Sequence, residues 1–220
     1  MLPRPPTFRL TAETRSPLTE TNARQTLSVH DCDGADREWV LESSVAKVSI
    51  FNSQNLTLHL RGRILTSTVE VFKCRNLRLV IGSSSASFLA EAAAVPLGTL
   101  QLDPPLDKVE IEYAAPRQVG KLILAPLASQ NEAGRPTFGF TDLSVRASAD
   151  TDATVLFDRD GALHFPPSDA TPREGPTTIA PGRVAEGFDM ARQLVVSHDD
   201  ETGWRITGLE RGEKDYPVLA

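Results

Sequence analysis

Cysteine, aromatic side chains and long hydrophobic runs are all scarce in this chain of 220 residues. Its two cysteines, Cys32 and Cys74, are too few for a disulfide framework or a cysteine zinc site. No apolar stretch approaches the roughly 20 residues of a membrane-spanning helix, and the proline-rich residues 1–6 lack the apolar segment of a secretory signal. Aromatics make up only 6%, so small aliphatic side chains must supply most of the core. We therefore expect a cytoplasmic protein without membrane contact.

An excess of positive charge is also absent, because the formal net charge is −6. This argues against sequence-independent binding of nucleic acid, which depends on a basic surface. The glycine- and serine-rich residues 82–85 lack the Gly-Lys-Ser/Thr ending of a phosphate-binding loop, and no His or Cys pair has the spacing of a zinc site. We expect no metal and no cofactor.

The strongest pattern in the sequence is a repeat of short alternating runs. Residues 48–60 and 69–81 share Val, Ile or Val, Phe, Asn and Leu in the same order, at an offset of 69 − 48 = 21 residues. Asn55 and Asn76 occupy the same place in each copy, between two runs in which apolar and polar side chains alternate. A further step of 21 aligns a third copy, in which Gly98, Leu100 and Leu102 fall under Leu77, Leu79 and Ile81. The copy then drifts and resumes at residues 106–112 and 119–124.

Alternation with period 2 predicts strands, and the Asn, Gly, Ser and Pro between them predict turns. Short strands that recur about every 20 residues are typical of the coils of a β-helix, in which each coil buries its apolar side against the next. Between Trp39 and Val145 there is room for about five such coils. An antiparallel sandwich is the alternative, but it would not require Asn55 and Asn76 to share a phase. The sequence thus predicts an all-β solenoid of about five short coils.

The flanking regions have different patterns. Residues 1–37 are polar and are interpreted as an N-terminal extension with a short helix near 11–27, while residues 38–150 form the predicted β-helix domain. Residues 151–220 contain two predicted hairpins, one with an Asp-Gly turn, separated by a segment rich in Pro and Thr. Their ranges are 154–165 for the first hairpin, 166–182 for the segment and 193–209 for the second hairpin.

The stretch from Leu60 to Ile81 resembles the C-terminal domain of cyclase-associated proteins. That family has a Lys-Gly-Lys-like step, an alternating strand and an Asn-Cys-Lys-Lys-Leu-like segment, and the matching positions here are Gly62, Arg63, Val69, Val71, Cys74 and Leu77. Tubulin-folding cofactor C is similar at a greater distance, although its arginine finger has no counterpart in residues 82–88. The resemblance covers roughly residues 38–125. It implies a right-handed parallel β-helix and a dimer in which a C-terminal hairpin exchanges between subunits.

Five cations fall on two neighbouring predicted coils: Arg61, Arg63, Lys73, Arg75 and Arg78. One interpretation is a basic ladder that steers an acidic protein partner towards this wall. The other is a charged flank that prevents edge-to-edge pairing and keeps the solenoid soluble. Our first functional hypothesis is a non-enzymatic protein-binding module, with actin as the partner that the resemblance implies.

A cofactor-independent lyase, isomerase or cyclase is the alternative. Histidine beside carboxylates supplies acid–base chemistry, and residues 146–182 would cover an open side of the helix to form a pocket. His59 is interpreted as a wall residue. The candidate catalytic residues are His30, Asp31, His164, His198 and Asp199.

The second hairpin bears on assembly. A lone two-stranded hairpin is marginal in water, so its strand-phase apolar residues must pack on the last coil of their own chain or on a second subunit. The resemblance favours a homodimer with these residues in its interface: Leu194, Val196, Trp204 and Ile206.

Overall fold

The computed structural model describes residues 6–82, 97–113, 119–125, 129–130, 134, 136–147, 150–157, 159, 163–165, 177–179, 193–199 and 203–209. Every regular element in this described part is a β-strand, and no helix there has the length and apolar character needed to span a bilayer. The helix predicted near residues 11–27 is wrong. Residues 11–25 form turns and irregular backbone, and the strand β2 (Thr26–His30) follows.

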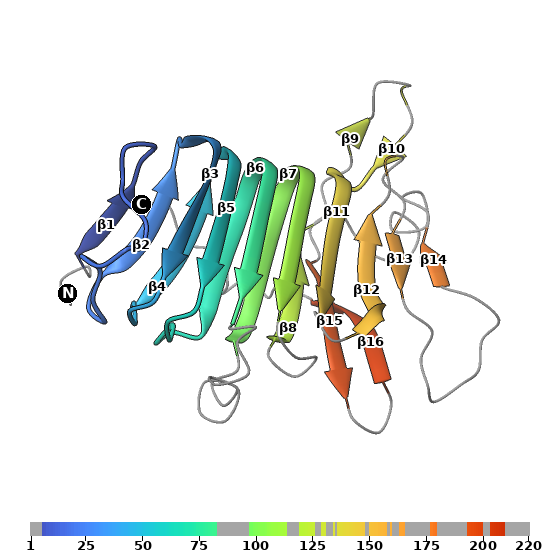
Figure 1. Ribbon diagram of the computed structural model, residues 1–220. Helices are drawn as coiled ribbons and strands as arrows, with labels where there is room; N and C mark the ends of the chain where they lie inside the picture. The colour runs from blue at the N-terminus through green and yellow to red at the C-terminus, as the bar shows by residue number, and fades with distance from the viewer. Residues whose placement is uncertain are drawn as a thin grey trace, which may run out of the picture.

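Fourteen strands form one curled sheet whose two parallel walls lie on either side of a bend (Figure 1). The first wall contains β1 (Thr7–Leu10), β2, β4 (Lys47–Phe51), the first parts of β6 (Thr68–Ile81) and β7 (Leu97–Tyr113), and β8 (Val119–Leu124). The second wall contains β3 (Asp33–Leu41), β5 (Gln54–Leu60), the second parts of β6 and β7, and β11 (Phe140–Ala147). The expectation of an all-β fold with parallel strands is confirmed.

The 21-residue repeat is the pairing register of the sheet. Val48 pairs with Val69 on the first wall, and Leu56 pairs with Leu77 on the second. The register also extends backwards, because Leu27 pairs with Val48 in the same parallel fashion. Residues 26–41 therefore add β2 and β3 to the two walls, although the polar character of most of them predicts an N-terminal extension.

Alternation along each strand turns every second side chain into one core. The eight residues expected to point inward are each at most 3% exposed and belong to a single hydrophobic cluster: Val48, Ile50, Leu56, Leu58, Val69, Val71, Leu77 and Leu79. Aliphatic side chains dominate this cluster, as the scarcity of aromatics requires. Trp39, Tyr113 and Phe140 are the largest fully buried side chains.

The third copy of the repeat is shifted from its predicted alignment. Leu100 pairs with Val69 rather than with Leu79, at an offset of 100 − 69 = 31 residues. Val109 takes the place opposite Leu77. The reason is that the connection at residues 82–96 is longer than the one at 61–67, and the extra residues lie outside the paired strands.

Both predicted hairpins are confirmed. Antiparallel pairing joins β12 (Asp150–Phe157) to β11 and to β13 (Leu163–Phe165), which pairs in turn with β14 (Thr177–Ile179). The second hairpin joins β15 (Gln193–Asp199) to β16 (Gly203–Leu209), and β15 pairs with β8 of its own chain, Val196 opposite Leu122. A short separate ribbon contains β9 (Ser129–Gln130) and β10 (Pro136–Thr137).

The N-terminal edge of the second wall is covered by the chain itself. The Leu18 amide donates to the Val40 carbonyl at 2.8 Å, and the Trp39 indole donates to the Thr14 carbonyl, also at 2.8 Å. The Ser16 hydroxyl accepts from the Val40 amide at 3.2 Å. Because a bare strand edge is a template for pairing with other chains, residues 12–18 protect β3.

Candidate functional site: a polar corner

The chain bends between the two walls at residues 31–36, 52–55, 73–76 and 104–108, which we call the corner. Asp31, Asn52 and Lys73 have left-handed backbone there, with φ of 52°, 47° and 53°. The left-handed conformation costs an L-residue roughly 1–2 kcal/mol, and Asn and Asp visit it more readily than other side chains. A second left-handed row precedes the second wall: Asn55, Asn76, Lys108 and Asp142.

Side-chain amides link neighbouring repeats along the outside of the corner. Asn76 Nδ2 donates to Asn55 Oδ1 at 2.9 Å, and Asn55 Nδ2 donates to Asp33 Oδ1 at 3.1 Å. Gln54 donates to the other Asp33 oxygen at 2.8 Å. The Gln54 hydrogen bond, followed by those from the Ala35 amide and Asn55, lowers the pKa of the Asp33 carboxyl. The carboxylate at this end of the row is therefore held ionised.

Small side chains point inward one position before these amides. Cys32, Ser53 and Cys74 are buried; Ser53 Oγ accepts from the Cys32 amide at 3.2 Å and donates to the Phe51 carbonyl at 2.8 Å. Burial raises the pKa of Cys74 to about 11. Burial, and then the charge of Asp33, raise the pKa of Cys32. Neither thiol has the low pKa of a nucleophile.

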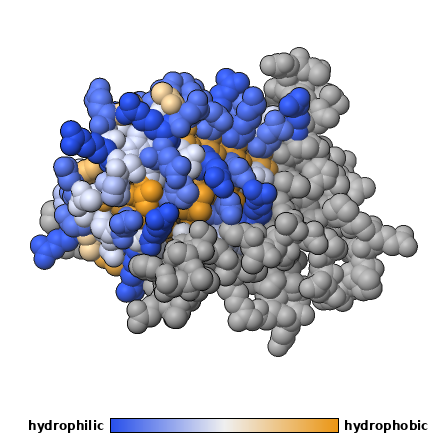
Figure 2. Space-filling view, in the orientation of Figure 1, coloured by the Kyte–Doolittle hydropathy of each residue, from blue (hydrophilic) through white to orange (hydrophobic). Residues whose placement is uncertain are grey.

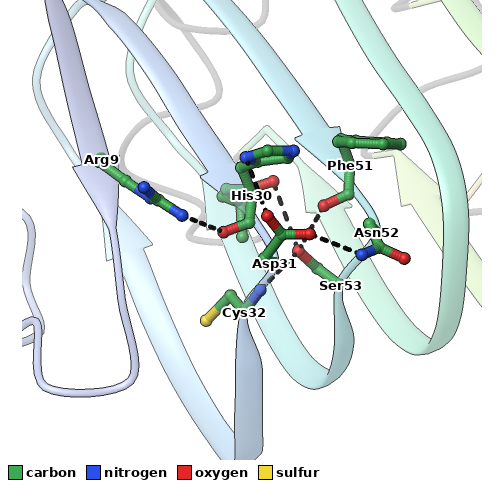
Figure 3. Close-up of polar contacts among 8 residues, drawn as sticks. Arg9, His30, Asp31, Cys32, Phe51, Asn52 and Ser53 are labelled. Atoms are coloured by element: carbon green, nitrogen blue, oxygen red, sulfur yellow. Dashed lines mark hydrogen bonds and ion pairs between the residues drawn. The ribbon is translucent and has the colours of Figure 1, made fainter.

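A stack of rings lies on the outer face of the first wall, beside the corner. The ring centroids of His30 and Phe51 are 4.6 Å apart, and those of Phe51 and Phe72 are 4.1 Å apart. Asp31 Oδ2 lies 3.3 Å from His30 Nδ1, and Asn52 donates to Asp31 at 2.5 Å (Figure 3). Of the predicted catalytic residues, His30 and Asp31 are thus in contact.

The other predicted catalytic residues do not join this pair. His198 and Asp199 belong to β15, which is five strand spacings from β2 along the first wall, or about 24 Å at about 4.8 Å per spacing. His164 pairs with Leu156 on the far side of β11. The side chains of these three residues lie outside the described part of the structure, as do those of the predicted interface: Leu194, Val196, Trp204 and Ile206.

Three of the five predicted partner-binding cations contact carboxylates of their own chain. Arg75 Nε is 2.8 Å from Asp107, and Arg78 Nη2 is 3.1 Å from Glu112. Arg61 is 3.7 Å from Glu42. Within the described residues, Arg63 and Lys73 are in no ion pair, and the Lys73 ammonium lies 5.6 Å from the centre of the Phe51 ring. The second wall therefore carries alternating charges rather than a continuous basic ladder.

Two hollows lie along the corner. The first, of about 310 Å³, is lined by Asn52, Ser53, Gln54, Lys73, Cys74, Arg75, Pro105 and Asp107. The second, of about 270 Å³, is lined by Asp36, Leu56, Thr57, Asn76, Leu77, Arg78, Lys108 and Glu110. Neither hollow has a histidine in its lining, and the enzyme alternative stays a prediction.

Sequence reasoning missed a second histidine–carboxylate contact. His59 Nε2 lies 2.6 Å from Glu38 Oε1 without the alignment of a hydrogen bond, so the contact is an ion pair when the imidazole is protonated. A step of 21 from Glu38 points to His59, but the register pairs Glu38 with Thr57, because a bulge between Asp33 and Arg37 shortens the local offset. The contact is diagonal across two strands. The ring stack had a clearer signal, since one step of 21 back from Phe51 reaches His30.

No group of three or more His, Cys, Asp or Glu side chains in the described part is arranged to hold a metal ion. No family model, curated protein or solved structure matches this chain. The corner and the two walls are consequently the features from which a function can be inferred.

Proposed function

We propose that the curled sheet is a right-handed parallel β-helix and that it serves as a protein-binding module. Parallel pairing at a constant step of 21 residues, with one core between the walls, supports the helix. Handedness follows from the strong preference of parallel crossovers for the right hand. The resemblance of residues 60–81 to cyclase-associated proteins points the same way.

The observation that carries the binding proposal is the charge mosaic on the second wall. Arg78 lies between Glu110 and Glu112, at 3.7 and 3.1 Å, and Glu110 also contacts Arg146 on β11. Paired cations release few counterions from a polyanion, which disfavours nucleic acid. Another protein presents both signs of charge and can match such a mosaic. The face shown in Figure 2 is largely hydrophilic, with apolar side chains near its middle.

An actin-type partner is the specific proposal that the resemblance suggests. Binding of purified actin to the full chain tests it. Arg63→Glu combined with Arg75→Glu should weaken the complex while the melting temperature stays nearly unchanged, and added salt should weaken the wild-type complex as well. Lys121→Glu, at an exposed position on β8, is the control. Equal binding by all three proteins would remove this face from the proposal, and no binding by the wild type would remove actin.

We further propose that the chain forms a homodimer through the second hairpin. The supporting feature is that β15 pairs through backbone hydrogen bonds with the edge of β8, and an equivalent edge in a second copy offers the same pairing. Light scattering at micromolar concentration should give twice the chain mass. Deletion of residues 193–220 should expose the β8 edge and give an aggregation-prone monomer. A full-length monomer would make the hairpin a cap on its own chain.

A further inference from the structure

We propose that the first corner hollow is an anchor for an acidic side chain of the protein partner, whose carboxylate binds between Lys73 and Arg75. The inference rests on the proposed binding function and names the chemistry that this part of the surface recognises. Its starting point is that two cations from the same strand, β6, line a common hollow.

The two cations differ in how they are held. Asp107 binds Arg75 through Nε at 2.8 Å, which orients the guanidinium and leaves its terminal N–H donors outside that contact. Lys73 lies over the Phe51 ring at 5.6 Å and has no carboxylate within ion-pair distance among the described residues. Between them is Cys74, whose buried side chain points inward. The hollow thus presents one oriented and one unneutralised cation with no bulky side chain between their backbones.

The adjoining repeat defines what the hollow does not offer. Asn52 and Gln54 occupy the positions that precede Lys73 and Arg75 by 21 residues, and their amides already donate to Asp31 at 2.5 Å and to Asp33 at 2.8 Å. Positive charge at these two corner positions is therefore specific to β6. A hollow of about 310 Å³ accommodates an Asp or Glu side chain, and its open shape suits a side chain that projects from a protein surface.

The backbone of Lys73 adds an independent reason to look for a role. Its φ of 53° is one that Asn, at the equivalent position 52, adopts more readily than Lys. A lysine at this position carries a conformational cost that its contact with Phe51 offsets only in part, since an exposed cation–π contact contributes about 0.5–1 kcal/mol. Binding of a carboxylate gives the side chain a purpose that stability alone does not.

The test uses a variant that copies the preceding repeat, Lys73→Asn with Arg75→Gln, which the corner already accommodates at positions 52 and 54. Backbone amide shifts of the full chain are followed by NMR during titration at low salt with the peptide acetyl-Gly-Glu-Gly-Glu-Gly-amide. Shifts should be confined to residues 52–54, 73–75 and 105–107. The dissociation constant should rise about tenfold or more in the double variant, as expected for loss of charge-assisted hydrogen bonds. Lys121→Asn, which removes one exposed cation elsewhere, should leave binding unchanged.

Three results would overturn the anchor: equal shifts with the peptide that carries Gln in place of Glu, shifts spread over all exposed cations, or unchanged affinity in the double variant. Free glutarate is titrated in parallel, and tighter binding of glutarate than of the peptide would assign the hollow to a small carboxylate instead. The outcome is separable from the wider proposal. Actin binding with no peptide binding would keep the module and remove the anchor, whereas the reverse would keep the anchor and remove actin.

Discussion

Asn76 donates its side-chain amide to Asn55 across 2.9 Å, from one repeat to the next and over 21 residues of sequence. Both residues have left-handed backbone, with φ of 48° and 54°. The same side chain thus solves two problems, because asparagine tolerates this conformation and its amide links neighbouring repeats. The corner is where the local preference of single residues and the register of the sheet agree.

Replacing Asn76 separates these two contributions. Asn76→Ala loses the hydrogen bond and places a Cβ in a strained conformation, so we expect a loss of about 2 kcal/mol in the free energy of unfolding. Asn76→Gly loses only the hydrogen bond, because glycine adopts positive φ without strain, and should cost less. Urea unfolding of the wild type and the two variants measures both losses. A glycine variant as unstable as the alanine variant would show that backbone strain contributes less than the hydrogen bond.

Lys108 has the same left-handed backbone as Asn76, with φ of 54°, but its side chain does not favour it. We expect Lys108→Asn to raise the free energy of unfolding by about 0.5–1 kcal/mol by relieving that strain. Lys121→Asn in the middle of strand β8 is the matched control and should be neutral or destabilising, because asparagine is a poor strand former. A decrease in stability for Lys108→Asn would contradict the assignment of strain.

The single core predicts a sharp contrast between two leucines. Leu79 is fully buried within the sheet, whereas Leu65 is 49% exposed in the connection before β6. Leu79→Ala should cost about 2–5 kcal/mol, the usual range for emptying a leucine site in a core. Leu65→Ala should change stability by less than about 0.5 kcal/mol. Thermal and urea unfolding of the two variants check the contrast, and similar costs would deny that the walls enclose one core.

Cys74 makes stability depend on pH in the alkaline range. Burial raises its pKa to about 11 in the folded protein, so folding favours the protonated thiol. This contribution is fully present below the unfolded thiol pKa, about 8.5, and is lost as pH rises towards 11. Cys74→Ser should flatten the fall in melting temperature over this window relative to wild type. Serine fits there because Ser53 occupies the equivalent place, and Ser53→Ala, which keeps the thiol, should retain the wild-type slope.

The parallel all-β architecture and its core were predictable because burial in a ladder repeats with the strands. Val48, Leu56, Val69 and Leu77 indicate both the period and the inward face. The start of the repeat was predictable too, since one step of 21 back from Val48 reaches Leu27. That step was obscured by the polar residues 11–25, which suggested a helix but form turns.

Other features followed from local departures that a constant period does not contain. The bulge before Arg37 moved Glu38 into diagonal contact with His59, and the long connection after β6 displaced Leu100 by ten residues relative to a step of 21, since 31 − 21 = 10. The pairing of Arg75 with Asp107 and of Arg78 with Glu112 depended on that displacement, because it decides which acidic residues face β6. The composition of the corner hollow was hidden for the same reason.

The displacement at residues 82–96 has a practical meaning for how this architecture can change. Hydrogen bonds between β6 and β7 resume in parallel order after a connection longer than the one at residues 61–67. The stacking of one repeat on the next is thus indifferent to how much chain is spent on that side. Such a position is a natural site for length variation between relatives, and a display site where a foreign peptide can be grafted while the walls keep their order.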